Sequence, residues 1–351
     1  MKRPILFTWV LLAGHFITHG QTTNISGVIN SYHKVLEIIP SKSCIRVENI
    51  SGLSINDQVM IVQMKGATIN TNNNTSFGDV SALNNAGNYE INHICIIKGD
   101  SVFFSYTILN NYTPAGKVQL VKIPVYQDAI VTDSLKAEPW NNTTGLGGVL
   151  AIQVGGQLTL NAPVYASGAG FKGGNFVTSS GVCSNFFLTQ DFYYNANNTN
   201  PQNGAFKGEG VYDFTNVDYS GGRGALANGG GGGNNHNNSG GGGADLSAGG
   251  IGGGNSSSVG CSGNFQGLGG KTLSSNSGQK IYLGGGGGAG HANNTSVSTG
   301  GGSGGGIIFI QAVTIVGNNQ KITATGKNGG NTTVTYQVTI LQAPSAPLIN
   351  P

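Results

Sequence analysis

The sequence predicts an all-β protein in which a small strand-rich domain precedes a β-solenoid-like sheet with a long glycine-rich insertion. Three observations support this class. Short apolar stretches are separated by Asn, Gly, Ser and Pro, one three-strand pattern occurs twice, and a glycine-rich tract lies between the two copies. Beyond the first 20 residues, no apolar stripe has the 3.6-residue period of an amphipathic helix.

Residues 1–20 have the features of a secretory signal peptide. Lys2 and Arg3 precede an apolar stretch from Ile5 to Ile17, and small residues follow at the cleavage position. The apolar stretch is short for a membrane span. We therefore expect a secreted or cell-surface protein that begins at Gln21 and has no transmembrane segment after cleavage.

Charge is scarce in this chain. Charged residues make up 9% of the sequence, against about a quarter in an average soluble protein. Without Lys2 and Arg3, the formal charge of +3 falls close to zero. This composition argues against a nucleic-acid partner or an anionic membrane surface.

We expect the N-terminal β domain over residues 21–140. Its apolar or alternating stretches are spaced by turn residues, as in small barrels and sandwiches. The stretch from Asn70 to Asn85 is rich in Asn, Thr and Ser and predicts a surface loop. The expected strands cover residues 34–39, 44–47, 58–62, 89–97, 102–104 and 118–121.

Four cysteines remain after signal cleavage. An oxidising compartment would allow them to pair, and pairing within each region gives Cys44–Cys95 and Cys183–Cys261. Buried free thiols in strands suit Cys44 and Cys95 equally well. No two cysteines have zinc-finger spacing, so we predict no metal site.

A repeated unit defines the second domain, predicted over residues 141–335. The two copies cover Gly147 to Gly168 and Gly305 to Gly326. Each begins with a glycine pair, continues with three short apolar strands and ends in small residues followed by glycine. This is the size of one coil of a parallel β-helix, and such coils must stack to bury their inner faces. Because two copies are too few, strands before Glu138 and residues 280–283 are expected to extend the stack. The predicted inward residues are Leu150, Ile152, Leu158, Leu160, Ile308, Ile310 and Ile315.

The glycine tract allows two structures. About fifty of the 61 glycines lie between Gly145 and Gly330, and each residue that becomes ordered loses conformational entropy. Either the tract is a flexible loop system, or its backbones pack side by side as extended three-fold helices that bond to each other. An ordinary antiparallel sandwich also explains the strands, but not the likeness of the two copies.

Several motifs resemble the N-terminal region of large glycine-rich surface proteins of gliding, Bacteroidetes-type bacteria. The motifs are those of residues 57–67, 85–90, 112–121, 139–145 and 168–174. The resemblance implies an adhesin-like protein exported by the type IX secretion system, and it assigns no catalytic residue. The glycine tract is also similar in composition to extracellular domains of certain receptor kinases and to phage tail adhesins.

Residues 336–351 read as a C-terminal strand and a proline-rich linker. Proteins of the resembled type end in a C-terminal sorting domain, which this sequence does not show. We therefore expect further domains to follow this chain. One reading of the function is accordingly a spacer fragment within a larger surface protein.

Two histidines follow pentaglycine stretches in the same way. Gly229–Gly233 leads to His236 and Asn237, and Gly284–Gly288 leads to His291, with Asn293 two residues later. Imidazoles in such loops can share a metal or contact a glycan. They can also bond to a backbone carbonyl and fix a turn.

One acidic cluster lies among aromatic residues: Glu209, Asp213 and Asp218 alternate with Tyr212 and Tyr219. It suits a sugar or calcium site, a polysaccharide lyase or hydrolase, or a solvated loop. No nucleophile elbow, phosphate loop or calcium-roll repeat is present. We predict no catalytic residue and no cofactor.

The leading prediction is a structural or adhesive protein that presents a glycine- and asparagine-rich surface. It would bind a surface, glycan or protein ligand through backbone groups and loop tips. Loops carry binding functions more often than cores do, and this favours the residues that we expect at loop tips. The predicted ligand-binding residues are His236, His291, Asn237, Asn293, Tyr212 and Tyr219.

Overall fold

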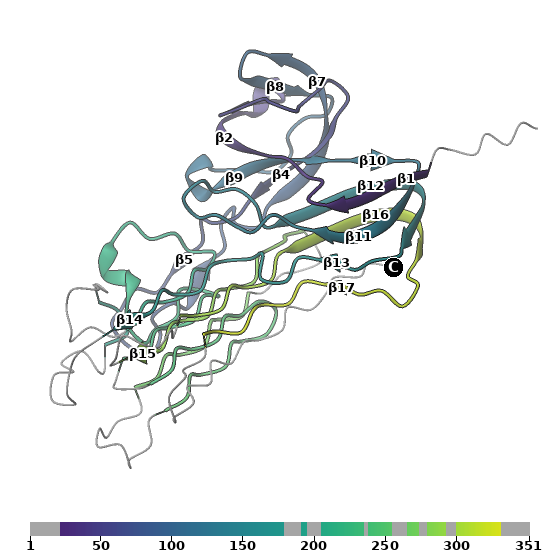
Figure 1. The fold of residues 1–351 in the computed structure, drawn as a ribbon. Helices are drawn as coiled ribbons and strands as arrows, with labels where there is room; N and C mark the ends of the chain where they lie inside the picture. The colour runs from purple at the N-terminus through teal and green to yellow at the C-terminus, as the bar shows by residue number, and fades with distance from the viewer. Residues whose placement is uncertain are drawn as a thin grey trace, which may run out of the picture.

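The computed structural model describes residues 22–178, 191–194, 205–234, 238–254, 265–273, 279–292 and 300–330. Within these ranges the chain forms strands and extended segments, and its helical turns are all short 3-10 helices (Figure 1). The all-β prediction is therefore confirmed for the described residues. The helical turns are η1 (Pro40–Lys42), η2 (Pro114–Gly116) and η4 (Val217–Ser220).

Six antiparallel strands close into an N-terminal barrel in the order β2-β3-β8-β7-β4-β9. They are β2 (Tyr32–Ile39), β3 (Cys44–Val47), β4 (Gln58–Gln63), β7 (Tyr89–Lys98), β8 (Ser101–Phe104) and β9 (Val118–Ile123). Strand β4 is buried along its whole length because its alternate side chains face two different cores. Val59 and Ile61 fill the barrel, whereas Met60 and Val62 face a second core outside it.

A parallel sheet follows the barrel, and its strands stack level upon level. They are β1 (Thr22–Gly27), β10 (Val125–Tyr126), β11 (Asp128–Lys136), β12 (Val149–Leu160), β13 (Val164–Tyr165), β16 (Ile307–Val316) and β17 (Ile322–Thr323). Strand β12 pairs with β10 and β11 on one side and with β16 on the other, always in parallel. Two short pairs complete the list: β5 (Thr68–Ile69) with β6 (Val80–Ala82), and β14 (Val177–Thr178) with β15 (His291–Ala292).

The two copies of the sequence repeat lie directly against each other. Val149 pairs with Ile307, the register continues through Gln153 opposite Gln311, and β13 stacks on β17 in the same way. The predicted stacking is therefore confirmed. Leu150, Ile152, Leu158 and Leu160 are at most 1% exposed inside the stack. Ile315 is 45% exposed, because no described strand covers the outer edge of β16.

Strand pairing differs from the predicted boundary at residue 140. Strands β10 and β11 join the parallel sheet, as expected for the strands before Glu138, so the barrel ends with β9 at Ile123. Strand β1 also belongs to the parallel sheet, where it pairs with β11. Residues 280–283 do not add to the stack: Ile281 N–H bonds to the Gly87 carbonyl, beside the barrel.

The predicted disulfide between Cys44 and Cys95 is not formed, and both residues are free thiols. Strand β8 pairs with β3 on one side and with β7 on the other, so it separates the two cysteines. Two strand spacings amount to about 9.5 Å, beyond the Cα separation that a disulfide can bridge. Cys183 and Cys261 lie outside the described residues.

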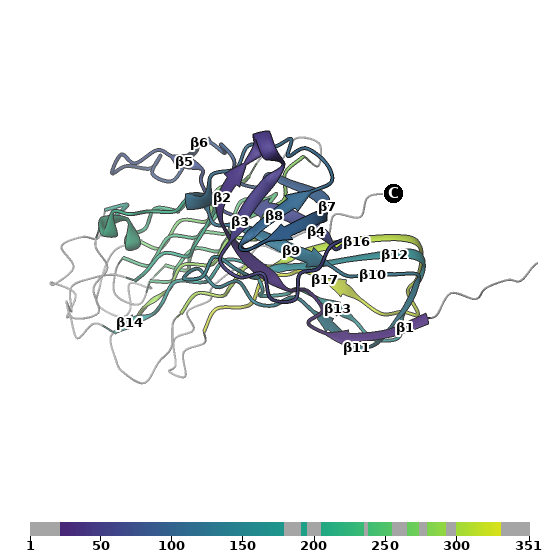
Figure 2. The ribbon, with the colours of Figure 1, turned by 90° about the horizontal axis from the view of Figure 1, so that it is seen from above.

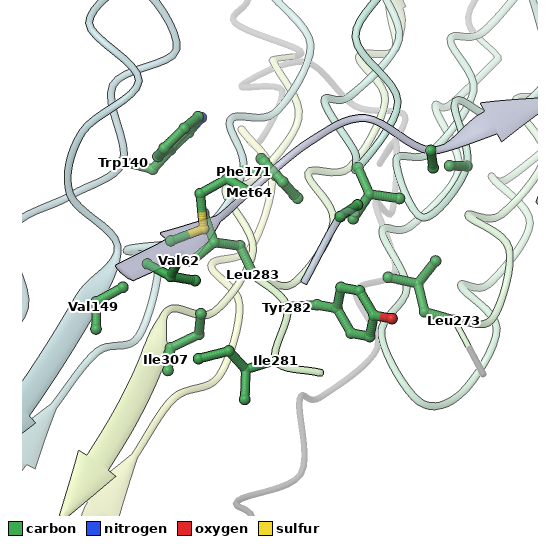
Figure 3. Packing of buried hydrophobic residues seen from close by; sticks show 14 of the residues in the cluster. Val62, Met64, Trp140, Val149, Phe171, Leu273, Ile281, Tyr282, Leu283 and Ile307 are labelled. Carbon is green, nitrogen blue, oxygen red and sulfur yellow. The ribbon is translucent and has the colours of Figure 1, made fainter. Parts of the chain in front are cut away.

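A second core joins the barrel, the sheet and the glycine-rich segments. Outward-facing residues of β4 meet Trp140, Phe171, Leu283 and Ile307 there, as Figure 3 shows. Trp140 and Phe171 contact edge to face, with ring centroids 5.8 Å apart. From this core the glycine-rich segments extend away from the β1 end of the sheet (Figures 1 and 2).

Candidate functional site

The glycine-rich segments form what we call the glycine layer: the described residues between Gly168 and Gly306. Its segments are extended and lie side by side, bonded through their backbones. Among its described glycines, only Gly168 and Gly222 have φ in the left-handed region, at +69° and +98°. The described residues thus follow the packed alternative and not the flexible one.

Hydrogen bonds from the segment Gly284–Ala289 show a three-residue period. Every third N–H donates to the same neighbouring segment, and the acceptor moves by three residues in step. The donor and acceptor pairs are Gly284 to Gly305 and Gly287 to Gly302; Gly285 to Ala244 and Gly288 to Gly241; Gly286 to Glu209 and Ala289 to Phe206. Three residues per turn is the repeat of a polyproline II helix, so this segment donates to three neighbours.

This packing explains why the segments are made of glycine. A Cβ atom added at Gly286 would lie 1.9 Å from the backbone oxygen of Lys172, and one at Gly304 would lie 2.0 Å from that of Gly284. These contacts are with backbone, which a rotamer change cannot relieve. The tract composition is thus a requirement of close approach, as at the axis of collagen.

A few buried polar side chains fix the layer to its surroundings. Asn228 is fully buried, accepts a bond from Val211 N–H at 2.8 Å, and donates to the Leu283 carbonyl at 3.1 Å. Lys207 Nζ donates to the carbonyls of Phe192 and Gly224, and burial lowers its pKa well below the usual value. Sequence analysis missed both residues, although a lone lysine among glycines and aromatics was a usable signal.

His291 is not at an exposed tip, which corrects the prediction for this residue. It is 1% exposed, lies in β15 opposite Val177, and its N–H donates to the Asn238 carbonyl at 2.9 Å. A side chain buried in this way supports the layer. His236, Asn237 and Asn293 lie outside the described residues.

The two predicted tyrosines pack against the protein. Tyr219 makes edge contacts with Phe77 and Tyr193, at centroid distances of 5.5 and 5.0 Å. Tyr212 is half-buried against the second core, and burial raises its pKa. Both rings therefore stabilise the loop around η4 and expose only part of their surface.

The three acidic residues of the cluster do not converge on one site. Glu209 Oε2 accepts bonds from Trp140 Nε1 at 3.2 Å and from Lys172 N–H at 3.1 Å. Asp213 lies 3.4 Å from Lys65 Nζ, and Asp218 is an exposed residue of η4. Within the described ranges, no group of three His, Cys, Asp or Glu side chains is arranged to hold a metal ion.

Several segment ends meet at one end of the layer, which we call the loop end. Strands β14 and β15 pair there, Asn234 N–H bonds to the Phe265 carbonyl, and Ser239 N–H bonds to the Gly253 carbonyl. The stretches 179–190, 195–204, 235–237, 255–264 and 293–299, outside the described residues, begin or end beside these contacts. Described residues that flank several of these stretches, among them Thr178, Asn234 and Ala292, therefore lie at this end of the layer.

No protein-family model matches the chain, and no curated protein matches it significantly. One partial structural match is the gp54 tailspike of Acinetobacter baumannii bacteriophage AP22, solved in complex with A. baumannii capsular saccharide. It is 11% identical, with 39% of this chain and 25% of the tailspike covered and a TM-score of 0.21. Another is the tailspike gp49 from Pseudomonas phage LKA1, at 10% identity, 41% and 24% coverage and a TM-score of 0.21. The chain spans about a quarter of each tailspike, and likeness at this level identifies neither fold nor function.

The described part of the chain has no helix with the length and apolar character needed to cross a membrane.

Proposed function

We propose that this protein is an exported, adhesin-like scaffold of the cell surface. In this proposal the parallel sheet and the glycine layer form one solenoid-like body. That body holds the connections at the loop end toward a surface, glycan or protein ligand. The motifs that resemble type IX secreted surface proteins support the expected location.

The loop end is the observation that carries this proposal. A polar loop is a good binding element when a rigid scaffold positions it. The bonds of Asn234, Ser239 and His291 tie the loop ends to glycine segments that are themselves bonded on several sides. Such a base holds neighbouring loops in a fixed relation, as a multi-loop binding surface requires.

The glycine backbone itself is a poor ligand surface. The N–H groups of Gly284 to Gly288 all donate within the layer, so none of them is free for a partner. We had expected both backbone groups and loop tips to contact the ligand. We now propose that the loop tips make this contact and that the backbone of Gly284 to Gly288 does not. His236, Asn237 and Asn293 remain the predicted contact residues, because they fall in the stretches beside the loop end.

A polysaccharide-active enzyme is the second candidate, and the described acidic residues give it little support. Glycoside hydrolysis needs two carboxyl groups on either side of the scissile bond. Glu209 is occupied by Trp140 and Lys172, and Asp213 pairs with Lys65. Their present contacts anchor the loop and do not form an acid–base pair.

Retention on a panel of polysaccharides and cell surfaces tests the proposal. We expect the mature protein to be retained without releasing oligosaccharide. Replacing His236, Asn237 and Asn293 together by alanine is expected to weaken retention about tenfold, with an unchanged melting temperature. The matched control replaces residues 274–278, which lead to Lys280 beside Asn88 of the barrel, and it should leave retention intact. Oligosaccharide release, or equal retention of both variants, would refute the adhesin.

A further inference from the structure

Arg223 packs over two aromatic rings at the loop end of the glycine layer. It follows η4 by three residues, and its guanidinium carbon is 5.5 Å from the ring centroid of Phe192 and 5.6 Å from that of Phe265. Both rings are within the range of cation–π attraction. The two rings therefore help to hold the charge in place.

The guanidinium has no counter-charge among the described residues. Within the part of the chain that the structure describes, no carboxylate lies within ion-pair distance of the guanidinium, and its Nε is buried without a hydrogen-bond partner. The carboxylate of nearby Asp191 accepts a bond from Asn73, and only the Asp191 backbone oxygen contacts Arg223, through its N–H at 3.3 Å. By contrast, Arg46 on the barrel bonds to both Asp100 and Glu37.

Burying a cation without a counter-charge costs free energy, and a bound anion would offset that cost. Burial disfavours the charged guanidinium and lowers the pKa of Arg223. A carboxylate matches its planar donors through two parallel hydrogen bonds.

We propose that Arg223, packed over Phe192 and Phe265, binds the carboxylate of an acidic saccharide. The inference rests on the proposed adhesive function and specifies its ligand class. A uronic acid carries one carboxylate per sugar unit, which matches one unpaired cation.

The charge distribution argues for a saccharide over an acidic peptide. Several acidic residues in a row would need several cations at one place. The second cation near Arg223 is a lysine whose ammonium group already bonds to backbone carbonyls. Lys207 is 5% exposed and bonds to two carbonyls, so it is not free to contact a second anion. One carboxylate per ligand unit is what a single arginine can neutralise.

Titration calorimetry with a glucuronate-containing hexasaccharide tests this inference. We expect Arg223→Met to weaken binding about tenfold or more, since it removes a bidentate charged contact but keeps an apolar chain over the rings. Arg223→Lys should also weaken binding, because a lysine lacks the planar donors. Arg46→Met is the control and should bind as the wild type does. A melting temperature for each variant shows whether it has folded.

Further ligands separate this inference from the proposed function. Unchanged affinity in a folded Arg223→Met variant overturns the site, and so does equal binding of the carboxyl-reduced hexasaccharide. Tighter binding of poly-glutamate that depends on Arg223 overturns the saccharide and favours an acidic peptide. If wild-type protein is retained on neutral glycans alone, the site fails while the adhesive function stands. If no surface or glycan is bound at all, both fail.

Discussion

At the scale of single residues, Gly286 shows how closely the segments of the glycine layer are packed. A Cβ there would meet the Lys172 carbonyl oxygen at 1.9 Å, so Gly286→Ala must push two backbone segments apart. We expect a loss of unfolding free energy of about 3 kcal/mol or more, in the upper range for overpacking. Urea denaturation of the purified variant measures it.

Gly317 supplies the matched control. It lies in the turn after β16, and a Cβ there would find no atom within 4 Å. Gly317→Ala should change the unfolding free energy by less than about 0.5 kcal/mol. Equal stability of the two alanine variants would show that the segments around Gly286 are not packed as described.

Asp245 gives a pH-dependent prediction. Burial raises the pKa of its carboxyl to about 6, so the stability that this group contributes is fully present below about pH 4 and is lost as the pH rises through 6. Asp245→Asn, which stays neutral, should match the wild type at pH 4 and be more stable at pH 8 by up to roughly 3 kcal/mol. Urea unfolding of both proteins at the two pH values measures this difference. A variant that is equally stable relative to wild type at both values would count against the burial of Asp245.

Single-residue predictions from the sequence were less successful than pattern predictions. His291 was placed at a loop tip because glycines surround it, yet the packing of those glycines buries it. Cys44 and Cys95 were paired because they lie in one region, but β8 separates them. In both cases the outcome depends on which segments become neighbours in space, and local composition does not carry that information.

At the scale of elements, the parallel pairing of β12 with β16 is the central feature. Gln153 and Gln311 lie in register, so their Cα atoms are about 5 Å apart across neighbouring strands. The double variant Gln153→Cys and Gln311→Cys should be cross-linked in high yield by a short bismaleimide, as peptide mapping will show.

A displaced pair controls for non-specific reaction. Asn318 lies beyond the end of β16, where its side chain bonds to Asn161, eight residues along from Gln153. Gln153→Cys combined with Asn318→Cys should therefore give little cross-link. Similar yields from both double variants would contradict the register of the two copies.

The repeat was predictable because each copy carries the same local pattern: a glycine pair, short apolar strands and a glycine at the end. The pairing of β1 with the parallel sheet was not predictable, because Thr22–Gly27 is mainly polar and only Ile25 reaches the core. Closure of the barrel was equally hidden. Its strands were found, but the pairing of β2 with β9 joins residues that lie about ninety positions apart.

At the scale of the whole molecule, the second core connects the barrel to the glycine layer, and we expect the two to unfold together. After removal of the predicted signal peptide, Trp140 is the only tryptophan, and it lies in this core at 2% exposure. We expect thermal unfolding followed by Trp140 fluorescence to coincide with unfolding followed by far-UV circular dichroism. Two separated transitions would show that the barrel and the layer unfold independently.

The proposed scaffold function depends on the glycine layer being rigid at this same scale. A sparsely charged, glycine-rich body suits a spacer that holds loops in place. It does so only if the cross-bonds between its segments persist in solution. Slow hydrogen exchange is the property that separates persistent bonds from a flexible tract.

Hydrogen exchange followed by mass spectrometry on the peptide that contains Gly284–Gly288 is the most direct test of this account. Every N–H in this segment donates to a neighbouring segment, so we expect protection comparable to that of β12. Exchange of these five amides at the rate of an unstructured chain, with β12 still protected, would contradict the packed layer and the scaffold built on it.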